Sequence, residues 1–285
     1  MNWKSDSSKI MQYLLIFASL ITMVILFNMT LKSNLPYSME EKDCKIGYSE
    51  MYSQRVILNF TRNTELFLSL NDVWWKEKSN PINELPYGIK GTEQSINRIL
   101  AKIHYDMPEN IKRLACKRCA IIGNGYTLRN SSLGETINKY DVVIRINDAP
   151  VRGYEKDVGN KTTLRFFYPE SAGFMPEIEN NPNTLLVFLP FKQVDARWLS
   201  AILYNEKRTS KGFWKPPPLV WEANPSNIRI LNPYYIHQAA TKLLKIPLKV
   251  PPRSKQNSEH NITHEQLFLK KLVEVGAIKY LTVLL

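Results

Sequence analysis

Short apolar segments separated by polar stretches constrain the fold of this 285-residue chain more than any other feature. They read CAII (119–122), DVVIRI (141–146), TLRFFY (163–168) and TLLVFL (184–189), and their β-branched and aromatic residues are typical of buried strands. The segments between them have the polar character of helices and loops. Strands that alternate with helices pair in parallel, so we predict an α/β domain with a largely parallel sheet.

Two of the predicted strands end on asparagine. Asn124 lies between Gly123 and Gly125 after the first strand, and Asn147 follows the second. Ligands of such sheets bind at the carboxyl ends of the strands, and an asparagine amide can donate to a phosphate or ribose oxygen and accept from a base. The alternative is that both are ordinary turn residues. The chain lacks G-x-G-x-x-G and G-x-x-x-x-G-K, which argues against a nicotinamide dehydrogenase or a kinase.

The N-terminal region predicts a membrane anchor. No charged residue occurs from Ile10 to Leu31, a run that at the helical rise spans about 30 Å, enough to cross a bilayer core. Lys4 and Lys9 precede the run and favour a cytoplasmic tail over residues 1–9. The alternative is a cleaved signal peptide, which the length of the run disfavours. We expect residues 10–31 to be an uncleaved transmembrane signal anchor, with the rest of the chain in the secretory lumen.

The formal net charge of +12 predicts anionic partners, a class that includes nucleic acids, membrane surfaces and phosphorylated substrates. The lumenal location argues against nucleic acid as a partner. It also allows N-glycosylation at Asn-x-Ser/Thr sequons, although the sequon at Asn28 lies against the membrane and should stay unmodified. The acceptors that we predict are Asn59, Asn130, Asn160 and Asn261.

The remainder of the chain divides into two parts. Residues 32–80 show little periodicity and are interpreted as a stem that leads into the edge of a domain at residues 81–285. Turn signals in ELPYGIKG precede an amphipathic helix that we predict over residues 94–103. The apolar face of that helix comprises Ile96, Ile99, Leu100 and Ile103.

The cysteine count is odd. The chain has Cys44, Cys116 and Cys119, whereas an oxidising lumen favours pairs. Cys116 and Cys119 have the Cys-x-x-Cys spacing of redox and zinc motifs. Zinc is disfavoured because no second cysteine or histidine pair follows at zinc spacing. A redox motif is disfavoured because it would open a helix, whereas Cys119 opens a predicted strand.

One long block resembles the large sialyl motif of the animal sialyltransferases, glycosyltransferase family 29. It runs from Cys119 to Ser171 and reads CAIIGNGYTLRNSSLGETINKYDVVIRINDAPVRGYEKDVGNKTTLRFFYPES. The segments ELPYGIKG, KGFWKPPPLVW and IRILNP resemble the alpha-2,3 branch of that family. The resemblance implies a GT-A-like fold and a single-pass type II Golgi membrane enzyme that inverts configuration without a metal or other cofactor. CMP-sialic acid would be the donor and a galactose-terminated glycan the acceptor.

The resemblance also assigns roles to residues in and near the motif. The motif asparagines of the family contact the donor nucleotide, and they correspond to Asn124 and Asn147 here. An aromatic residue before a proline-rich turn lies near the donor phosphate in relatives, and Trp214 occupies that place. The alternative for Trp214 is a buried aromatic that only packs.

A short family motif, His-x-x-x-x-Glu, is present as HNITHE and begins at His260. The resemblance implies that His260 is the general base that takes the proton of the attacking galactose hydroxyl. Thr263 and Gln266 have the spacing of a capping box for a helix that runs to about Val275. The positive end of that helix would favour the neutral imidazole that a base requires. His264 is the alternative base.

The chain departs from the family in one place. Relatives carry a small sialyl motif, with a Thr-Thr-Gly turn, an apolar helix that holds a cysteine and a Gly-Phe-Gly strand, and then a His-Tyr-Tyr-Glu-like motif. None of these is present, and PLKVPPRSKQ runs directly into NSEHNITHEQ. The join at residues 256–258 has the form of an internal deletion, so we expect an incomplete sheet.

The deletion bears on the cysteines. The family pattern implies a disulfide between Cys44 and Cys116. The family partner of the cysteine at position 119 lies in the small motif, which this chain lacks, so we expect Cys119 to remain a thiol or to be cross-linked between chains. Two functions of different class follow from the resemblance. One is an active Golgi sialyltransferase, and the other is a catalytically inactive truncated form that is retained in the secretory pathway or associates with full-length enzyme.

Overall fold

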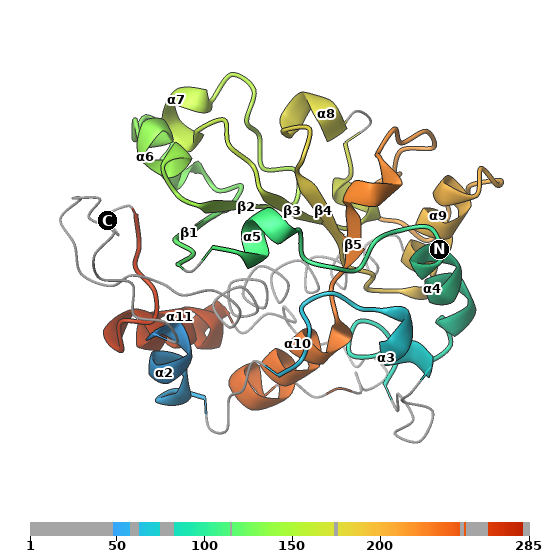
Figure 1. Ribbon diagram of the computed structural model, residues 1–285, viewed down its shortest axis with the longest axis horizontal. Helices are drawn as coiled ribbons and strands as arrows, with labels where there is room; N and C mark the ends of the chain where they lie inside the picture. The colour runs from blue at the N-terminus through green and yellow to red at the C-terminus, as the bar shows by residue number, and fades with distance from the viewer. Residues whose placement is uncertain are drawn as a thin grey trace.

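The computed structural model describes residues 48–57, 63–74, 83–114, 116–173, 176–245, 248 and 262–281 (Figure 1). The predicted signal anchor at residues 10–31 and the junction at residues 256–258 lie outside these ranges. Within them, no helix combines the length and the apolar character that crossing a membrane requires.

A parallel sheet forms the centre of the described structure and confirms the α/β prediction. The strands lie side by side in the order of the sequence, and each neighbouring pair is parallel. They are β1 (Cys119–Ile122), β2 (Val142–Ile146), β3 (Leu164–Phe167), β4 (Leu185–Phe188) and β5 (Ile228–Ile230).

The strand β5 was not predicted as a strand. Its three residues are too few for a recognisable period, and they follow a long proline-containing segment without strand periodicity. Tertiary contacts define it instead. Its register aligns Val187 of β4 with Arg229, and Leu231, the residue after the strand, bridges to Phe67 in an antiparallel arrangement. The segment around Phe67 therefore belongs to the core of the domain.

Helices cover both faces of the sheet, because strands that are apolar on both sides must be buried on both sides. Figure 1 shows α6, α7 and α8 on one side and α10 and α11 on the other. Alternate residues of each strand point to opposite faces. Thus Val142, Ile144 and Ile146 pack with the α10 and α11 layer, whereas Val143 packs with Ile137 of α6.

Most of the helices are short. Around the sheet lie α5 (Glu109–Lys112), α6 (Gly134–Asn138), α7 (Glu155–Val158), α8 (Pro176–Glu179) and α10 (Pro233–Gln238). The longer helix α9 (Gln193–Leu203) packs against α4 (Glu93–Leu100) over β3, β4 and β5. The described residues also include α2 (Tyr48–Gln54), α3 (Leu70–Trp74), a π-helical turn (Ala239–Leu244) and α11 (Ile262–Glu274).

Two predicted helices are present with altered ends. The helix predicted over residues 94–103 is α4, and its predicted apolar residues are all buried. The helix predicted after Thr263 is α11, but it begins at Ile262. Thr263 therefore lies inside the first turn, and the prediction that it caps the helix is wrong. Gly276 has a positive φ of 79°, which suits the residue just past the helix end.

Candidate active site at the carboxyl edge of the sheet

The turn after β1 carries Asn124 on an open surface. Gly123, Asn124 and Gly125 are all exposed, and a Cβ added to either glycine would meet no described atom within 4 Å. The Asn124 amide nitrogen lies 3.5 Å from an Asp148 carboxylate oxygen, to which it donates. The backbone of this turn is therefore accessible to a ligand, and the Asn124 amide is oriented by the neighbouring turn.

Asn147, at the end of β2, is buried and held in an unusual backbone conformation. Its φ of 57° lies in the left-handed region, which asparagine tolerates better than most residues. Its N–H donates to the Phe166 carbonyl at 2.8 Å, and its own carbonyl accepts from Arg165 at 2.8 Å. The side chain is only 8% exposed, yet its Oδ1 atom has no hydrogen-bond partner among the described residues.

An unsatisfied buried amide oxygen is uncommon in folded proteins and needs an explanation. A ligand that donates a hydrogen bond at this point would supply one. The two asparagines follow neighbouring parallel strands. The register aligns Ile122 with Arg145, and Asn124 and Asn147 each lie two residues beyond that aligned pair. The structure thus brings the predicted Asn124 and Asn147 together at one edge, where Asn124 contacts Asp148, the residue after Asn147.

Trp214 reaches this edge from the loop that follows α9. It is 41% exposed, so it is not a buried packing aromatic. Its backbone N–H donates to a Glu170 carboxylate oxygen at 3.4 Å, and its side chain hydrogen-bonds with Tyr168. The ammonium of Lys215 lies 4.0 Å from the Asp148 carboxylate. The loop therefore contacts the ends of both β2 and β3.

A buried charge cluster lies beneath Trp214, and sequence reasoning missed it. The Lys192 ammonium lies 2.8 Å from a carboxylate oxygen of Glu170 and 2.8 Å from one of Asp195. Asp195 also accepts from the backbone N–H groups of Phe191 and Lys192 at the start of α9. The second oxygen of Glu170 is buried and has no hydrogen-bond partner among the described residues.

Electrostatics distinguish the members of this cluster. Burial raises the pKa of Glu170, and the nearby Asp195 charge adds to the rise although Lys192 opposes it. Burial alone would lower the pKa of Lys192, but the two carboxylates outweigh it and raise that pKa. Lys192 therefore stays positively charged and is the ion-pair partner of both carboxylates. The FFYPES segment contains Glu170, but nothing in the sequence pairs it with a lysine 22 positions later.

The remaining predicted site residues are dispersed. His260, Cys44, Asn59 and Asn261 lie outside the described residues. His264 is exposed on the first turn of α11.

Among the other predicted residues, the sequon asparagines Asn130 and Asn160 are both exposed. Cys119 is a buried thiol in β1 that donates to the Lys117 carbonyl at 3.3 Å, and burial raises the pKa of the thiol. Because Cys119 keeps its thiol, the Cys-x-x-Cys pair is not bridged.

The sequence of the chain matches one protein family. A model of glycosyltransferase family 29 (sialyltransferase) matches residues 63–257. The chain is 43% identical to the mouse and human proteins named CMP-N-acetylneuraminate-beta-galactosamide-alpha-2,3-sialyltransferase 4, over 87% of this chain and 88% of each relative. It is 34% identical to a chimpanzee type 2 lactosamine alpha-2,3-sialyltransferase, over 70% of this chain and 75% of that protein.

The fold also matches solved structures. A crystal structure of a mammalian sialyltransferase superposes with a TM-score of 0.60 at 20% identity and covers 87% of this chain and 97% of that chain. A mammalian sialyltransferase in complex with Gal-beta-1-3GalNAc-ortho-nitrophenol gives the same TM-score at 22% identity and covers 87% of this chain and 98% of that chain.

The alignment with the mouse relative bears on the missing block. It extends over 295 residues but uses only 87% of this 285-residue chain, so the relative contains residues that this chain lacks. The family match ends at residue 257, inside the junction at residues 256–258.

Proposed function

This chain belongs to glycosyltransferase family 29, the sialyltransferases, and from that premise we propose that it transfers sialic acid from CMP-sialic acid to the 3-hydroxyl of a terminal galactose. The observation that carries the proposal is the 43% identity to alpha-2,3-sialyltransferases over most of both chains. The carboxyl edge supports it, because Asn124, Asn147 and Trp214 all lie there and the Asn147 amide oxygen has no hydrogen-bond partner among the described residues.

The transfer requires one bond to form and one to break. The oxygen of the galactose 3-hydroxyl forms a bond to the anomeric carbon of sialic acid while the bond from that carbon to the CMP phosphate breaks. The electron pair of the broken bond leaves with CMP. We propose that His260 takes the hydroxyl proton, and that Asn147 and Asn124 hold the nucleotide. Because the base and the donor residues supply these needs, we propose that transfer proceeds without a metal or other cofactor.

The direct test is a transfer assay on the chain itself. Radiolabelled CMP-sialic acid and N-acetyllactosamine should give a labelled product from which an alpha-2,3-specific sialidase releases the label. A chelator should leave the rate unchanged. His260→Ala should lower turnover by a factor on the order of 10²–10⁴ and leave CMP binding intact. His264→Ala is the matched control and should retain turnover, and the reverse result would move the role of base to His264.

A second function is favoured by the residues that the chain lacks. The alternative is a catalytically inactive truncated isoform, retained in the secretory pathway or associated with full-length enzyme. Transfer depends on holding the reacting atoms close, and a displacement of about 1 Å can cost on the order of a hundredfold in rate. A folded chain without transfer, together with activity after the small motif is restored, would establish this alternative.

For location we propose a single-pass type II protein of the Golgi membrane, with residues 10–31 as the anchor and the C-terminal domain in the lumen. Endoglycosidase treatment should then lower the mass of the expressed chain by removing glycans from Asn59, Asn130, Asn160 or Asn261. Surface exposure of Asn130 and Asn160 supports the proposal. Recovery of an unglycosylated cytosolic protein would contradict it.

For the cysteines we propose a disulfide between Cys44 and Cys116. The disulfide-bonded state of Cys116, beside the thiol of Cys119, supports this pairing. Peptide mapping under non-reducing conditions should recover one cross-linked peptide that contains Cys44 and Cys116. A peptide that joins Cys116 to Cys119 would overturn it.

A further inference from the structure

The loop that follows β2, residues 147–152, has its backbone fastened by two side chains of opposite charge. One guanidinium nitrogen of Arg165 donates to the carbonyls of Asn147 at 2.8 Å and Ala149 at 3.0 Å. One carboxylate oxygen of Glu179 accepts from the N–H of Val151 at 2.7 Å and of Arg152 at 3.3 Å. The cation thus meets carbonyls and the anion meets N–H groups, so each half of the loop is bound by a charge-assisted contact.

The two side chains are themselves held in place. Arg165 is 6% exposed. Its other guanidinium nitrogens donate to the Asn180 side-chain oxygen at 2.6 Å and to the Glu179 carbonyl at 3.1 Å. Burial lowers the pKa of Arg165 to about 10, so the guanidinium is charged at neutral pH. The Arg165–Glu179 clamp, as we call this pair, therefore joins β3, the end of α8 and the loop into one unit.

The clamp acts on the main chain of Asn147 in particular. The N–H of Asn147 donates to Phe166, the neighbour of Arg165 on β3, and its carbonyl accepts from Arg165 itself. Both backbone groups of the residue are thereby fixed while its φ stays in the left-handed region. The Oδ1 atom is buried and has no hydrogen-bond partner among the described residues. A rigid backbone that presents an unsatisfied acceptor is the arrangement of a preorganised binding group.

We propose that Arg165 and Glu179 are positioning residues that hold the loop after β2 so that the Asn147 amide oxygen accepts a hydrogen bond from the nucleoside monophosphate part of the donor. The inference rests on the proposed function, and it adds residues that do not touch the ligand. The ligand group that donates this hydrogen bond to Asn147 is an N–H or an O–H, either an exocyclic amine of the base or a ribose hydroxyl.

The chain offers a matched control in Arg229 on β5. Arg229 is 5% exposed. Like that of Arg165, its guanidinium donates hydrogen bonds to backbone carbonyls, here those of Asp106, Ser226 and Ile228. Ser226 and Ile228 lie at the amino end of β5, whereas Asn147 lies at the carboxyl end of β2, the opposite edge of the parallel sheet. Loss of Arg229 should therefore reproduce the structural cost of losing a buried arginine without any effect on the loop after β2.

The first measurement needs no ligand. Amide hydrogen exchange of residues 147–152 should accelerate by about tenfold or more in Arg165→Met and in Glu179→Ala, because exchange reports local opening. Glu179→Gln keeps an acceptor oxygen and should recover part of the protection. Arg229→Met should leave exchange in this loop unchanged. Unchanged exchange in both Arg165→Met and Glu179→Ala would overturn the clamp.

The second measurement asks whether the clamp acts through Asn147. Calorimetry with CMP should show that Arg165→Met weakens binding by roughly tenfold in the otherwise unaltered chain and has no further effect in an Asn147→Gly background, since residues that act as a unit are not additive. Arg229→Met should leave the affinity unchanged. Equal losses in both backgrounds would remove the positioning role. If the unaltered chain binds no CMP, the proposed function fails, and the exchange result alone then decides whether the clamp exists.

Discussion

The two edges of the sheet are built from the same strands but differ in whether their buried polar groups have hydrogen-bond partners. At the amino edge, the Asp141 carboxylate accepts from the backbone and the guanidinium of Arg118 at 2.8–3.0 Å, and Arg118 also donates to the Lys139 carbonyl. At the carboxyl edge, the Oδ1 atom of Asn147 and one oxygen of Glu170 are buried without a hydrogen-bond partner among the described residues.

We interpret this difference as a separation between groups that stabilise the fold and groups that are available to a ligand. A protein can satisfy buried polar groups at one end of a sheet, as the Arg118–Asp141 pair shows. Unsatisfied groups cost free energy and persist where the surrounding structure compensates for them, as is common at functional sites. The comparison therefore predicts that changes at the amino edge affect stability alone, whereas loss of the unsatisfied Asn147 amide at the carboxyl edge affects ligand binding.

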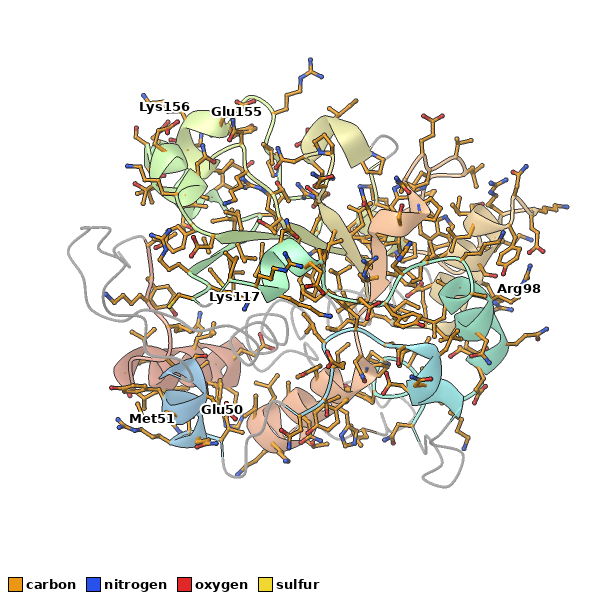
Figure 2. The ribbon with its side chains drawn as sticks, viewed as in Figure 1. Glu50, Met51, Arg98, Lys117, Glu155 and Lys156 are labelled. Carbon is orange, nitrogen blue, oxygen red and sulfur yellow. The ribbon has the colours of Figure 1, made fainter. Side chains whose placement is uncertain are left out.

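The largest effect should come from Lys192, which is the ion-pair partner of two buried carboxylates. Lys192→Met leaves Glu170 and Asp195 without it and should lower the free energy of unfolding by about 3–5 kcal/mol, measured by urea denaturation. The control is Arg98→Met at the exposed Arg98 of α4 (Figure 2). This change breaks the exposed ion pair with Glu206, which follows α9, and should change stability little. Equal losses in the two variants would show that the buried cluster has no special electrostatic role.

The next largest effect is a loss of ligand affinity without a change in the free energy of unfolding. Asn147→Gly removes the unsatisfied amide and tolerates the left-handed backbone, so the free energy of unfolding should hardly change. The affinity for CMP should fall about tenfold, the value of one hydrogen bond. Calorimetry and urea denaturation of the same sample separate the two quantities. A stability loss with unchanged CMP affinity would place Asn147 with the amino-edge residues and break the comparison.

The amino edge should show the opposite behaviour, with a smaller magnitude. Asp141→Ala removes the contacts with Arg118 and should lower the free energy of unfolding by about 1 kcal/mol, since the pair is partly exposed to solvent. The CMP affinity should stay the same. A loss of affinity in this variant would mean that the two edges are coupled through β1 and β2.

The smallest effect is a difference in pH dependence. Burial raises the pKa of Glu170 in the folded state above its ordinary value of 4.5. Between pH 4.5 and that raised pKa the folded state binds more protons than the unfolded state, so stability falls as the pH rises. Burial would also raise the pKa of Asp141, but the hydrogen bonds and charge of Arg118 outweigh it and lower that pKa below 3.8. The stability from Asp141 is present above pH 3.8 and is lost as the pH falls through the folded pKa.

Two substitutions make this difference measurable. Glu170→Gln should flatten the fall in stability above pH 4.5, and Asp141→Asn should flatten the acid loss below pH 3.8. Urea denaturation across this pH range gives both curves. The two substitutions should change the slope of stability against pH in opposite directions. A change of slope in the same direction in both variants would contradict the contrast between the edges.

Much of the fold could be predicted because it depends on local patterns. The apolar runs that became β1 to β4, and the helical spacing of Ile96, Ile99 and Leu100, are periodic and long enough to recognise. β5 was missed because its few residues are defined by pairing with β4 and by the bridge from Phe67. The start of α11 was misplaced by two residues, because a helix capped by Thr263 would begin at residue 264 and capping residues mark helix ends only approximately.

The site divides in the same way. Asn124 and Asn147 could be predicted, because a residue that ends a parallel strand must lie at the ligand-binding edge. The sequence by itself thus determined the sheet, its polar edge and the resemblance of residues 119–171. Only the tertiary structure decided that Lys192 lies between Glu170 and Asp195, and that Arg165 and Glu179 fasten the loop of Asn147. These contacts join separate elements, so they depend on packing and register rather than on spacing along the chain.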